Sequence, residues 1–435
     1  MTFIKCQIVC SRCLKMKKKR WIYFATAVAS AALSVGLIAC DDETSDGSGD
    51  SSQANNEAQY AETIAVNEAF TDNCQMRNEP NWYKFEVPQD GRLLIEIEHE
   101  NIPTKERVWS VALYTSDGVT EYADCQKEWY VRGNENFSSP SLGVAAGTYY
   151  LLLTGGNTTY VDWEFSDLPY TVNLNFTESE NWETENNGSV ETATPIPVNA
   201  TTHGTLVNSS DTDWYCFTLE QNGYFTFDFT HENVPSTDTF WKLQLYGADG
   251  ITDYTNVEKT WSVKGNENVS SAKMGAAAGM YYLQIKAYNH SDKEYHLNIN
   301  YTATNNWEKE NNGGYDKANT LTLNETVYGT IICDDSAWSY AEDQDWYSLS
   351  VSPAMGLKLT FTHTMLPKTG IYWKITVYGS DGITKVATAD IKGNEESTQL
   401  VWSGTGTFYI KITYGNNVDY HSEDQYGLLV ERLDS

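Results

Sequence analysis

The chain repeats itself at a spacing of 132 residues, and this repeat constrains its fold more than any other feature. Three Trp-Tyr pairs and three single tryptophans keep the spacing: Trp82, Trp214 and Trp346, then Trp109, Trp241 and Trp373. Solenoid units are much shorter, at roughly 20–50 residues, so each copy should have its own core. We therefore predict three copies of one domain, over residues 54–178, 179–303 and 304–435.

Apolar and polar residues alternate within each copy. Phe225, Phe227 and Phe229 alternate with threonine and aspartate, and the segment Trp241 to Leu245 does the same before a turn at Asp249-Gly250. Alternation with a period of two is typical of half-buried strands, and Asp-Gly is typical of a tight turn. No stretch after residue 53 has the apolar spacing of a helix. The sequence predicts an all-β protein of three tandem antiparallel β-sandwiches.

Residues 1–39 predict an export signal. The basic residues Lys17 to Arg20 precede an uncharged run, Trp21 to Ala39, which ends at Cys40. A basic segment, an apolar segment and small residues before a cleavage point are the parts of a secretory signal peptide. With Cys40 after that point, the segment resembles a bacterial lipoprotein signal in which Leu37-Ile38-Ala39-Cys40 is the lipobox and Cys40 carries the lipid. Met16 is then the expected start of translation.

A transmembrane anchor is the alternative, because an uncharged run of 19 residues can just span a bilayer. Residues 40–53 are acidic and lack an apolar cluster, so we expect a solvated tether. These features predict a lipid-anchored, extracytoplasmic protein of the bacterial cell envelope, and they leave open which membrane and face carry it. The chain has 59 acidic and 29 basic residues, and its net charge of −30 disfavours nucleic acid as a partner.

The second and third copies carry several motifs in the same order. Each has Asn-Trp-Glu-x-Glu-Asn-Asn, a Gly-Thr, Asp-x-Asp-Trp-Tyr, an Asp-Gly turn and a glycine before a Tyr-rich or Phe-containing strand. This order resembles the bacterial pre-peptidase C-terminal domain, a jelly-roll-like β-sandwich found beside secreted peptidases and related to clostridial collagen-binding domains. The resemblance covers residues 181–435 well and residues 60–178 in part. It implies calcium that ties the amino-terminal segment of each domain onto the sandwich.

Five oxygen-bearing side chains in each of these copies are the predicted calcium ligands. They are Glu183, Glu185, Asn187, Asp211 and Asp213 in the second copy, and Glu308, Glu310, Asn312, Asp343 and Asp345 in the third. Two acids at positions i and i+2 of an extended segment project to one face, so they can share an ion with the aspartate pair of a neighbouring loop. Calcium takes six to eight oxygens of this kind. A solvated acidic edge without an ion is the alternative.

The first copy departs from this pattern. At the matching places it has Ala54-Asn55-Asn56 and Glu79-Pro80-Asn81, so its calcium site is expected to be lost. It alone carries Cys74 together with Cys125, whose shifted positions hold leucine and valine. A secreted domain can use a disulfide where related domains use a metal, and two separate buried thiols are the alternative.

No group of residues predicts catalysis. His99, His231 and His363 recur, but each continues the inward register of its strand, so we expect a histidine at the rim of the core that bonds to a backbone carbonyl. The sequence has neither a Gly-x-Ser-x-Gly elbow nor a glycine-rich phosphate loop. The signal, the tether and the three copies account for all residues, so we predict a non-catalytic protein.

Four aromatic residues are candidate ligand contacts. Trp129 and Trp261 precede a Gly-Asn-Glu loop, and Phe240 and Tyr372 precede the central tryptophan of their copies. If exposed, such rings can stack on sugars or pack on a matrix protein, and an ordinary core position is the alternative.

Two functional hypotheses follow. The first is a surface-displayed protein whose three modules gain avidity for a polysaccharide or a matrix protein. The second is a structural spacer or assembly component of the envelope that binds only calcium. An accessory subunit of a secreted peptidase is a third candidate. Exposure of Trp129 and Trp261 would favour the first hypothesis, and their burial would favour the second.

Overall fold

The computed structural model describes residues 55–122, 129–156, 163–254, 259–333, 343–415 and 420–433. These residues form strands, with short 3-10 helices at Ala58–Tyr60, Val190–Thr192 and Tyr315–Lys317, and they confirm the predicted all-β class. No helix in these ranges is long and apolar enough to cross a membrane. The predicted signal, Cys40 and the tether lie outside the described residues.

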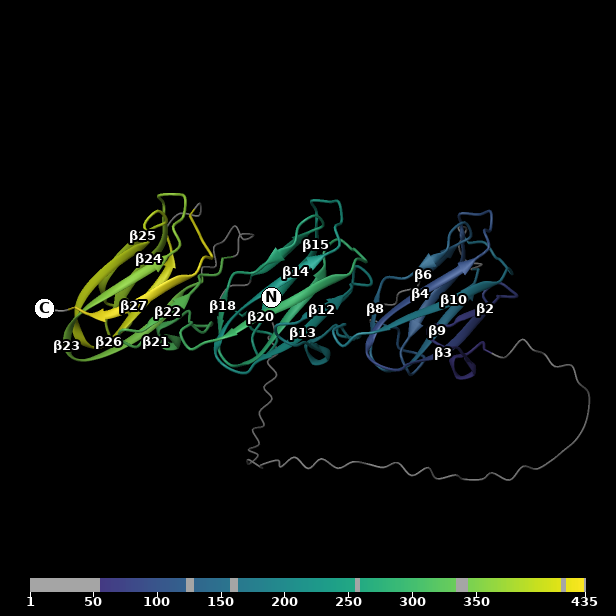
Figure 1. The fold of residues 1–435 in the computed structure, drawn as a ribbon, viewed down its shortest axis with the longest axis horizontal. Coiled ribbons are helices and arrows are strands. Elements are labelled where there is room, and N and C mark those ends of the chain that lie inside the picture. Colours follow the sequence, from purple (N-terminus) through teal and green to yellow (C-terminus); the bar gives the residue numbers. More distant parts are fainter. Residues whose placement is uncertain are drawn as a thin grey trace, which may run out of the picture. The chain divides into compact units, whose positions relative to one another are not determined.

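The first copy consists of two sheets that enclose one core (Figure 1). The first sheet has the order β1 (Glu62–Thr63), β3 (Pro80–Val87), β9 (Gly147–Gly155), β5 (Arg107–Tyr114) and β6 (Trp129–Arg132). The second has the order β2 (Ala69–Asp72), β10 (Tyr170–Glu178), β4 (Gly91–His99) and β7 (Phe137–Ser138), and β8 (Leu142–Val144) also pairs with β4. The pairing is antiparallel except for the two-residue contact of β1 with β3.

The second copy repeats this arrangement strand for strand. Its first sheet has the order β11 (Thr194–Pro195), β13 (Thr212–Leu219), β19 (Gly279–Ala287), β15 (Thr239–Tyr246) and β16 (Thr260–Lys264). Its second sheet has the order β12 (Thr201–Gly204), β20 (Tyr295–Ala303), β14 (Gly223–His231) and β17 (Val269–Ser270), with β18 (Met274–Ala276) paired to β14. The alternation noted in the sequence therefore corresponds to strands with one buried face.

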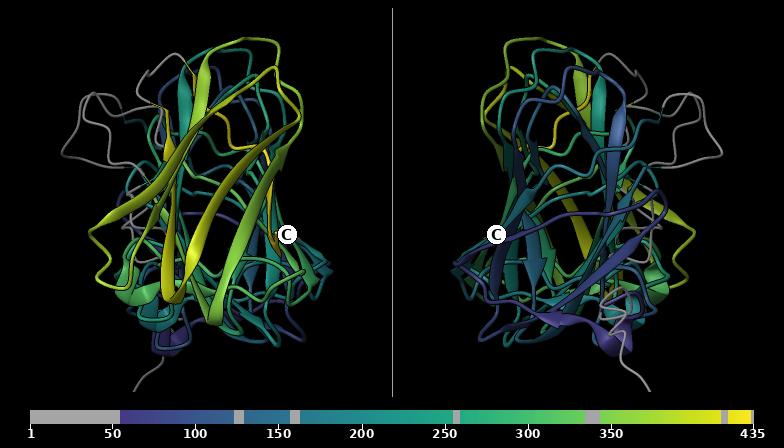
Figure 2. Two further views of the ribbon diagram at one scale, coloured as in Figure 1. Left: turned by 90° about the vertical axis from the view of Figure 1, so that its left-hand side faces the viewer. Right: turned by 90° about the vertical axis from the view of Figure 1, so that its right-hand side faces the viewer.

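In the third copy the two sheets are continuous, because two long strands belong to both (Figure 2). The order is β22 (Thr326–Gly329), β27 (Tyr426–Arg432), β23 (Asp345–His363), β26 (Ser397–Tyr414), β24 (Ile371–Tyr378) and β25 (Lys385–Lys392), and β21 (Asn319–Thr320) pairs with β23. The register of β23 against β26 shifts between Val351 and Met355, where the pair passes from one layer to the other.

Each copy buries its own hydrophobic cluster around a tryptophan with no exposed surface: Trp109, Trp241 or Trp373. The recurring histidines pack against these tryptophans. As predicted, their rings bond to backbone carbonyls, since the Nδ1 of His99 lies 2.8 Å from the carbonyl oxygen of Glu100 and that of His231 lies 2.7 Å from the carbonyl oxygen of Glu232. These histidines therefore belong to the structural rim of the core.

Candidate metal sites at the junctions between copies

The segment that enters the second copy brings the predicted acids together. The backbone amide of Glu183 donates to the carbonyl oxygen of His203 on β12, at 2.9 Å, and the amide of Trp214 on β13 donates to the carbonyl oxygen of Asn187, at 3.0 Å. The segment is thus fixed to both sheets. Carboxylate oxygens of Glu183, Glu185 and Asp213 all lie within 4.8 Å of one another.

The other two predicted ligands border this group. The side-chain nitrogen of Asn187 lies 3.4 Å from Oε2 of Glu183. Asp211 accepts hydrogen bonds from the amides of Val207 and Thr212, at 2.7 and 2.8 Å, which fix the turn before β13. The second copy therefore gathers all five predicted side chains at one place.

The third copy builds the same group from the equivalent residues. Carboxylate oxygens of Glu308, Glu310 and Asp345 lie within 4.8 Å of one another. The amide of Thr330 donates to Oε1 of Glu308 at 2.7 Å, just as the amide of Thr205 donates to Oε1 of Glu183 at 2.6 Å. Asp343 accepts a 2.8 Å hydrogen bond from the amide of Ile332.

Both groups are withdrawn from solvent. Glu183 is 1% exposed, and Asp213, Asp343 and Asp345 are 0% exposed. Burial raises the pKa of Glu183 to about 7 and that of Asp343 to about 7. The pKa of Asp213 is raised well above its ordinary value by burial and, next, by the charges of neighbouring acids. The charged form of each carboxylate is therefore unfavourable without a compensating cation.

Several oxygens in these groups have no hydrogen-bond partner. They include Oδ1 of Asp213, Oδ1 of Asn187 and both carboxylate oxygens of Glu310. A buried carboxylate without a partner costs folding free energy unless a cation binds it. The donors are carboxylate and amide oxygens, and no histidine or cysteine belongs to either group as the structure describes them. Such a donor set fits a hard cation such as calcium.

Buried tyrosines complete each group, a role that the acid motifs alone do not predict. The hydroxyl of Tyr215 donates to Oε2 of Glu183 at 2.6 Å, and the hydroxyl of Tyr295 donates to Asp213. In the third copy, Tyr347 and Tyr426 hold the equivalent places. The sequence contains one indication of this role: Tyr215 and Tyr347 are 132 residues apart, and each directly follows the repeated tryptophan of its motif.

In the first copy, the equivalent tyrosines Tyr83 and Tyr170 have different hydrogen-bond partners. Asn81, which stands where the second copy has Asp213, donates to the hydroxyl of Tyr170 at 2.8 Å. Tyr83 donates to Oδ2 of Asp72 at 2.7 Å and lies 2.6 Å from the hydroxyl of Tyr170. Glu79 accepts a 2.9 Å hydrogen bond from the amide of Met76. A neutral amide thus takes the place of a buried carboxylate in this copy.

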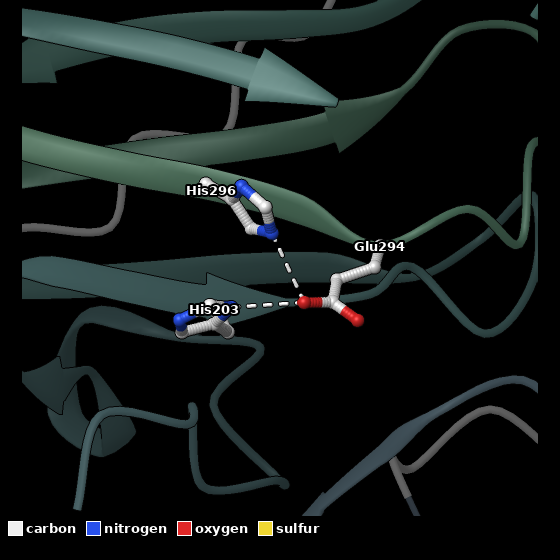
Figure 3. A group of neighbouring side chains, drawn as sticks. All are labelled: His203, Glu294 and His296. Atoms are coloured by element: carbon white, nitrogen blue, oxygen red, sulfur yellow. Dashed lines mark hydrogen bonds and ion pairs between the residues drawn. The ribbon is translucent and has the colours of Figure 1, made fainter. Parts of the chain in front are cut away.

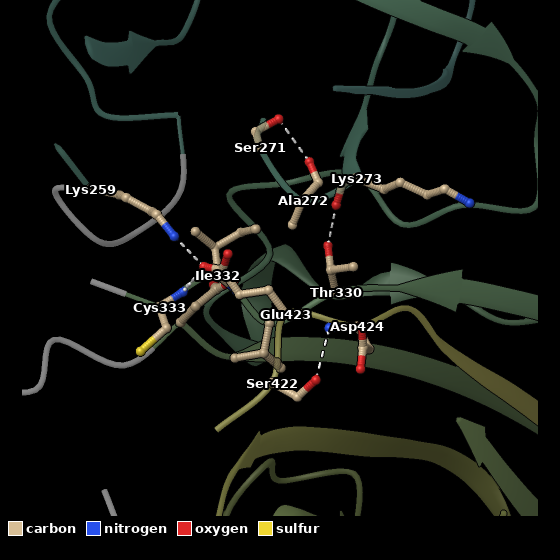
Figure 4. A network of polar contacts seen from close by, with 12 residues as sticks. Lys259, Ser271, Ala272, Lys273, Thr330, Ile332, Cys333, Ser422, Glu423 and Asp424 are labelled. Atoms are coloured by element: carbon tan, nitrogen blue, oxygen red, sulfur yellow. Dashed lines mark hydrogen bonds and ion pairs between the residues drawn. The ribbon is translucent and has the colours of Figure 1, made fainter. Parts of the chain in front are cut away.

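Both acid groups lie where one copy meets the next. Thr205 donates through Oγ1 to the carbonyl oxygen of Ser141 in the first copy, at 2.5 Å. Thr330 donates in the same way to the carbonyl oxygen of Lys273 in the second, at 2.5 Å (Figure 4). Val207 and Ile332, which follow these threonines, are buried in the core of the preceding copy. The residues that surround each acid group therefore pack against the copy before it.

An ion pair adds to the second junction. Lys259 of the second copy binds Oε1 of Glu423 in the third, and the same oxygen accepts a 2.9 Å hydrogen bond from the amide of Cys333 (Figure 4). Lys273 also donates to Oε1 of Gln425, at 3.0 Å. The third copy thus contacts the second through loops that lie far apart in the sequence.

The structure places the four candidate aromatic residues wholly or partly inside the protein, which favours the alternative of an ordinary core position. Trp129 is 7% exposed and Tyr372 is 6% exposed. Trp261 and Phe240 are partly buried and pack against the core of the second copy. The reason is strand register, since Trp129 on β6 lies opposite the buried Val111 on β5 and Trp261 on β16 lies opposite the buried Leu243 on β15. These rings are therefore parts of the core and its border.

Cys74 is fully buried in the first copy, next to β9. Cys125 lies outside the described residues. The disulfide between them therefore stays a prediction.

Comparison with known proteins finds similarity to a collagenase among curated sequences. The chain is 25% identical over 251 residues to a collagenase, ColT, of Clostridium tetani (strain Massachusetts / E88). The match covers 55% of this chain but only 24% of the collagenase, so the chain spans about a quarter of the length of that relative. No family model matches the chain.

Two solved structures are also similar. The pre-peptidase C-terminal domain of a collagenase from Bacillus anthracis is matched over 98% of its length and 28% of this chain, with 20% identity and a TM-score of 0.20. A Clostridium perfringens ZmpB structure, with an M60 catalytic domain and two CBM51 domains, is matched over 34% of its length and 85% of this chain, with 9% identity and a TM-score of 0.18. The curated match to a collagenase agrees with the resemblance of the sequence motifs to a domain found beside secreted peptidases.

Proposed function

We propose that the chain is a non-catalytic extracytoplasmic protein that binds calcium at its two junctions and presents its three modules to a polysaccharide or a matrix protein. The observation that carries the proposal is the pair of buried acid groups. Each places three carboxylates within 4.8 Å of one another at a junction. Like charges so close and so buried call for a bound cation.

Calcium would supply the positive charge that these carboxylates lack. Its ligands would come from Glu183, Glu185, Asn187, Asp211 and Asp213 at the first junction and from their equivalents at the second: Glu308, Glu310, Asn312, Asp343 and Asp345. Because the acid-bearing segments also pack on the preceding copy, we expect the ion to stiffen the junction as well as the domain.

The location is the second part of the proposal. The matched collagenase relative and the lipobox-like sequence that ends at Cys40 both favour a protein outside the cytoplasm. We propose that Cys40 carries a lipid that anchors the chain to a bacterial membrane and that residues 41–53 form a tether between lipid and modules.

The ligand is the third part. Similarity to a collagenase over 251 residues favours a ligand in the extracellular matrix or a polysaccharide. The second candidate function is a calcium-bound spacer or assembly component of the envelope, and the burial of Trp129 and Tyr372 favours it, because it removes two of the four proposed contacts.

A binding screen separates these two functions. The purified chain is applied to a glycan array and to a panel of matrix proteins that includes fibrillar collagen, with calcium and with a chelator. Calcium-dependent capture on one class of ligand is the result expected of a binding protein. Absence of capture in both conditions, together with calcium-dependent stiffening measured by small-angle scattering, would leave the spacer function.

A further inference from the structure

Two histidines and a glutamate form a compact group on the second copy (Figure 3). None of the three belongs to the acid groups at the junctions. Oε1 of Glu294 lies 2.8 Å from Nδ1 of His203 and 3.0 Å from Nε2 of His296. One ligand atom from each residue lies within 4.8 Å of the other two. Three metal-binding side chains thus point at one place.

The strand register produces this group. His203 on β12 lies directly opposite His296 on β20 in an antiparallel pair, where facing side chains stand about 4.5–5.5 Å apart at Cβ. Glu294 precedes His296 by two residues and so projects to the same face. That face is the outer one, because the neighbours Tyr295 and Leu297 are fully buried.

The ring of His203 is held before any ligand arrives. Trp182 stacks on it with centroids 5.7 Å apart. The backbone of His203 is fixed on both sides, by a 2.8 Å hydrogen bond to the carbonyl oxygen of Asn181 and a 2.9 Å hydrogen bond from the amide of Glu183. The ring of His296 meets that of His203 edge to face, with centroids 4.6 Å apart. Binding of a ligand would therefore require little further ordering of these two side chains.

The group is also open to solvent. The side chains of His203, Glu294 and His296 are 31%, 23% and 43% exposed. An ion can therefore reach the group from solvent.

We propose that His203, Glu294 and His296 bind a late first-row divalent cation, with zinc as the best fit. Two imidazole nitrogens and one carboxylate oxygen, with water at a fourth position, are a ligand set that zinc accepts. Imidazole favours zinc, copper and nickel, whereas calcium favours oxygen alone, so this site and the junction sites should bind different metals.

The other copies lack this set at the same register. In the first copy the paired positions hold Thr71 and Thr171, whose Oγ1 atoms lie 3.0 Å apart. In the third copy they hold Tyr328 and Gly427. The site therefore belongs to the second copy alone among the described residues, and the threonine pair supplies a substitution that the fold already tolerates.

Zinc titration of the purified chain by calorimetry, with calcium saturating, tests the proposal. We expect one zinc ion per chain in the wild type, and loss of this binding in the double variant His203→Thr, His296→Thr. Glu294→Gln should weaken binding at least about tenfold, since even outer-shell partners cost that much. His421→Thr, on the third copy, removes an exposed histidine outside the group and should leave binding unchanged.

A spectroscopic measurement distinguishes loss of the metal site from loss of the folded structure. Cobalt in place of zinc should give visible absorption in the wild type and in His421→Thr but not in the double variant. All variants should melt within error of the wild type in chelator, and if the double variant fails to fold, Glu294→Gln decides the question. The proposal fails if the wild type binds no zinc, or if the double variant binds it as tightly. Calcium is saturating in every titration and the junction groups contain no histidine, so zinc binding and calcium binding are measured separately.

Discussion

The carbonyl oxygen of Glu183 lies 2.2 Å from the point that a Cβ atom of Gly143 would occupy. At the second junction the carbonyl oxygen of Glu308 lies 2.4 Å from the equivalent point at Gly275. β8 and β18 therefore make the surface on which the acid-bearing segments lie, and only glycine permits the approach. In the third copy, Ser403 holds the position that corresponds to Gly143 and Gly275 in the strand pairing, so the glycine is absent there.

Gly143→Ala should loosen the first junction. The added methyl group cannot fit without displacement of the segment that carries Glu183, and overpacking of this kind costs about 1–3 kcal/mol. We expect a lower melting temperature and faster proteolysis near residues 179–182. Gly247→Ala is the matched control, because its nearest atom would lie at an ordinary 3.6 Å. Equal behaviour of the two variants would show that the contact is not needed.

Asp213→Asn should convert the first acid group into the arrangement of the first copy, where Asn81 takes this place. Without calcium, the variant should be about 1–2 kcal/mol more stable than the wild type, because a carboxyl group whose ionisation is opposed by burial and by neighbouring acids is replaced by a neutral amide. With calcium, it should gain less stability than the wild type. Chemical unfolding in calcium and in chelator measures both effects. A variant that is less stable in chelator would contradict the repulsion described here.

The chelated protein should lose stability as the pH rises. The pKa of Glu183 is raised from 4.5 to about 7 in the folded chain, so between these values the folded state holds a proton that the unfolded state has released. Stability from this group is complete below the unfolded pKa and is lost as pH rises through the folded pKa, on the order of 3 kcal/mol.

Melting curves in chelator at about pH 5 and about pH 7.5 measure this loss. Saturating calcium should remove it, since the metal holds the carboxylates in their charged form. Asp213→Asn should reduce the slope in chelator. If the chelated wild-type chain is more stable at the higher pH, the pKa of Glu183 is not raised in the folded chain as described.

Cys40→Ala tests the proposed anchor. The wild type should partition into the detergent phase and lose residues 1–39, because a lipid on Cys40 follows cleavage before it. The variant should stay uncleaved or leave the detergent phase. Mass spectrometry of the amino terminus and phase partition measure the two effects. A variant that is cleaved at the same bond and partitions as before would exclude lipidation at Cys40.

The sequence predicted the fold class because its main signals are local or periodic. The alternation of Phe225, Phe227 and Phe229 follows directly from a strand with one buried face, and the repeat of the motif tryptophans shows that the strand set recurs. The continuous sheet of the third copy was not predictable, since it depends on β23 and β26 passing through a register shift that the residue pattern does not mark.

The candidate sites were predictable to different degrees. The acid groups could be named because Glu183 and Glu185, and Asp211 and Asp213, are spaced for one face of an extended chain. The burial of Trp129 could not be predicted, because it depends on the register of β6 against β5, and the residue pattern does not fix that register. The group of His203 and His296 depends on a strand pairing across more than ninety residues, which no local motif reveals.

Calcium titration by calorimetry tests the central claim most directly. We expect the wild-type chain to bind calcium at both junctions, Glu185→Gln to lose binding at the first alone, and Glu310→Gln to lose it at the second alone. A variant with both substitutions should release no binding heat, and the control Glu79→Gln, in the first copy, should titrate as the wild type does. If the wild type binds no calcium, or if the double variant binds as much as the wild type, calcium at the junctions is contradicted.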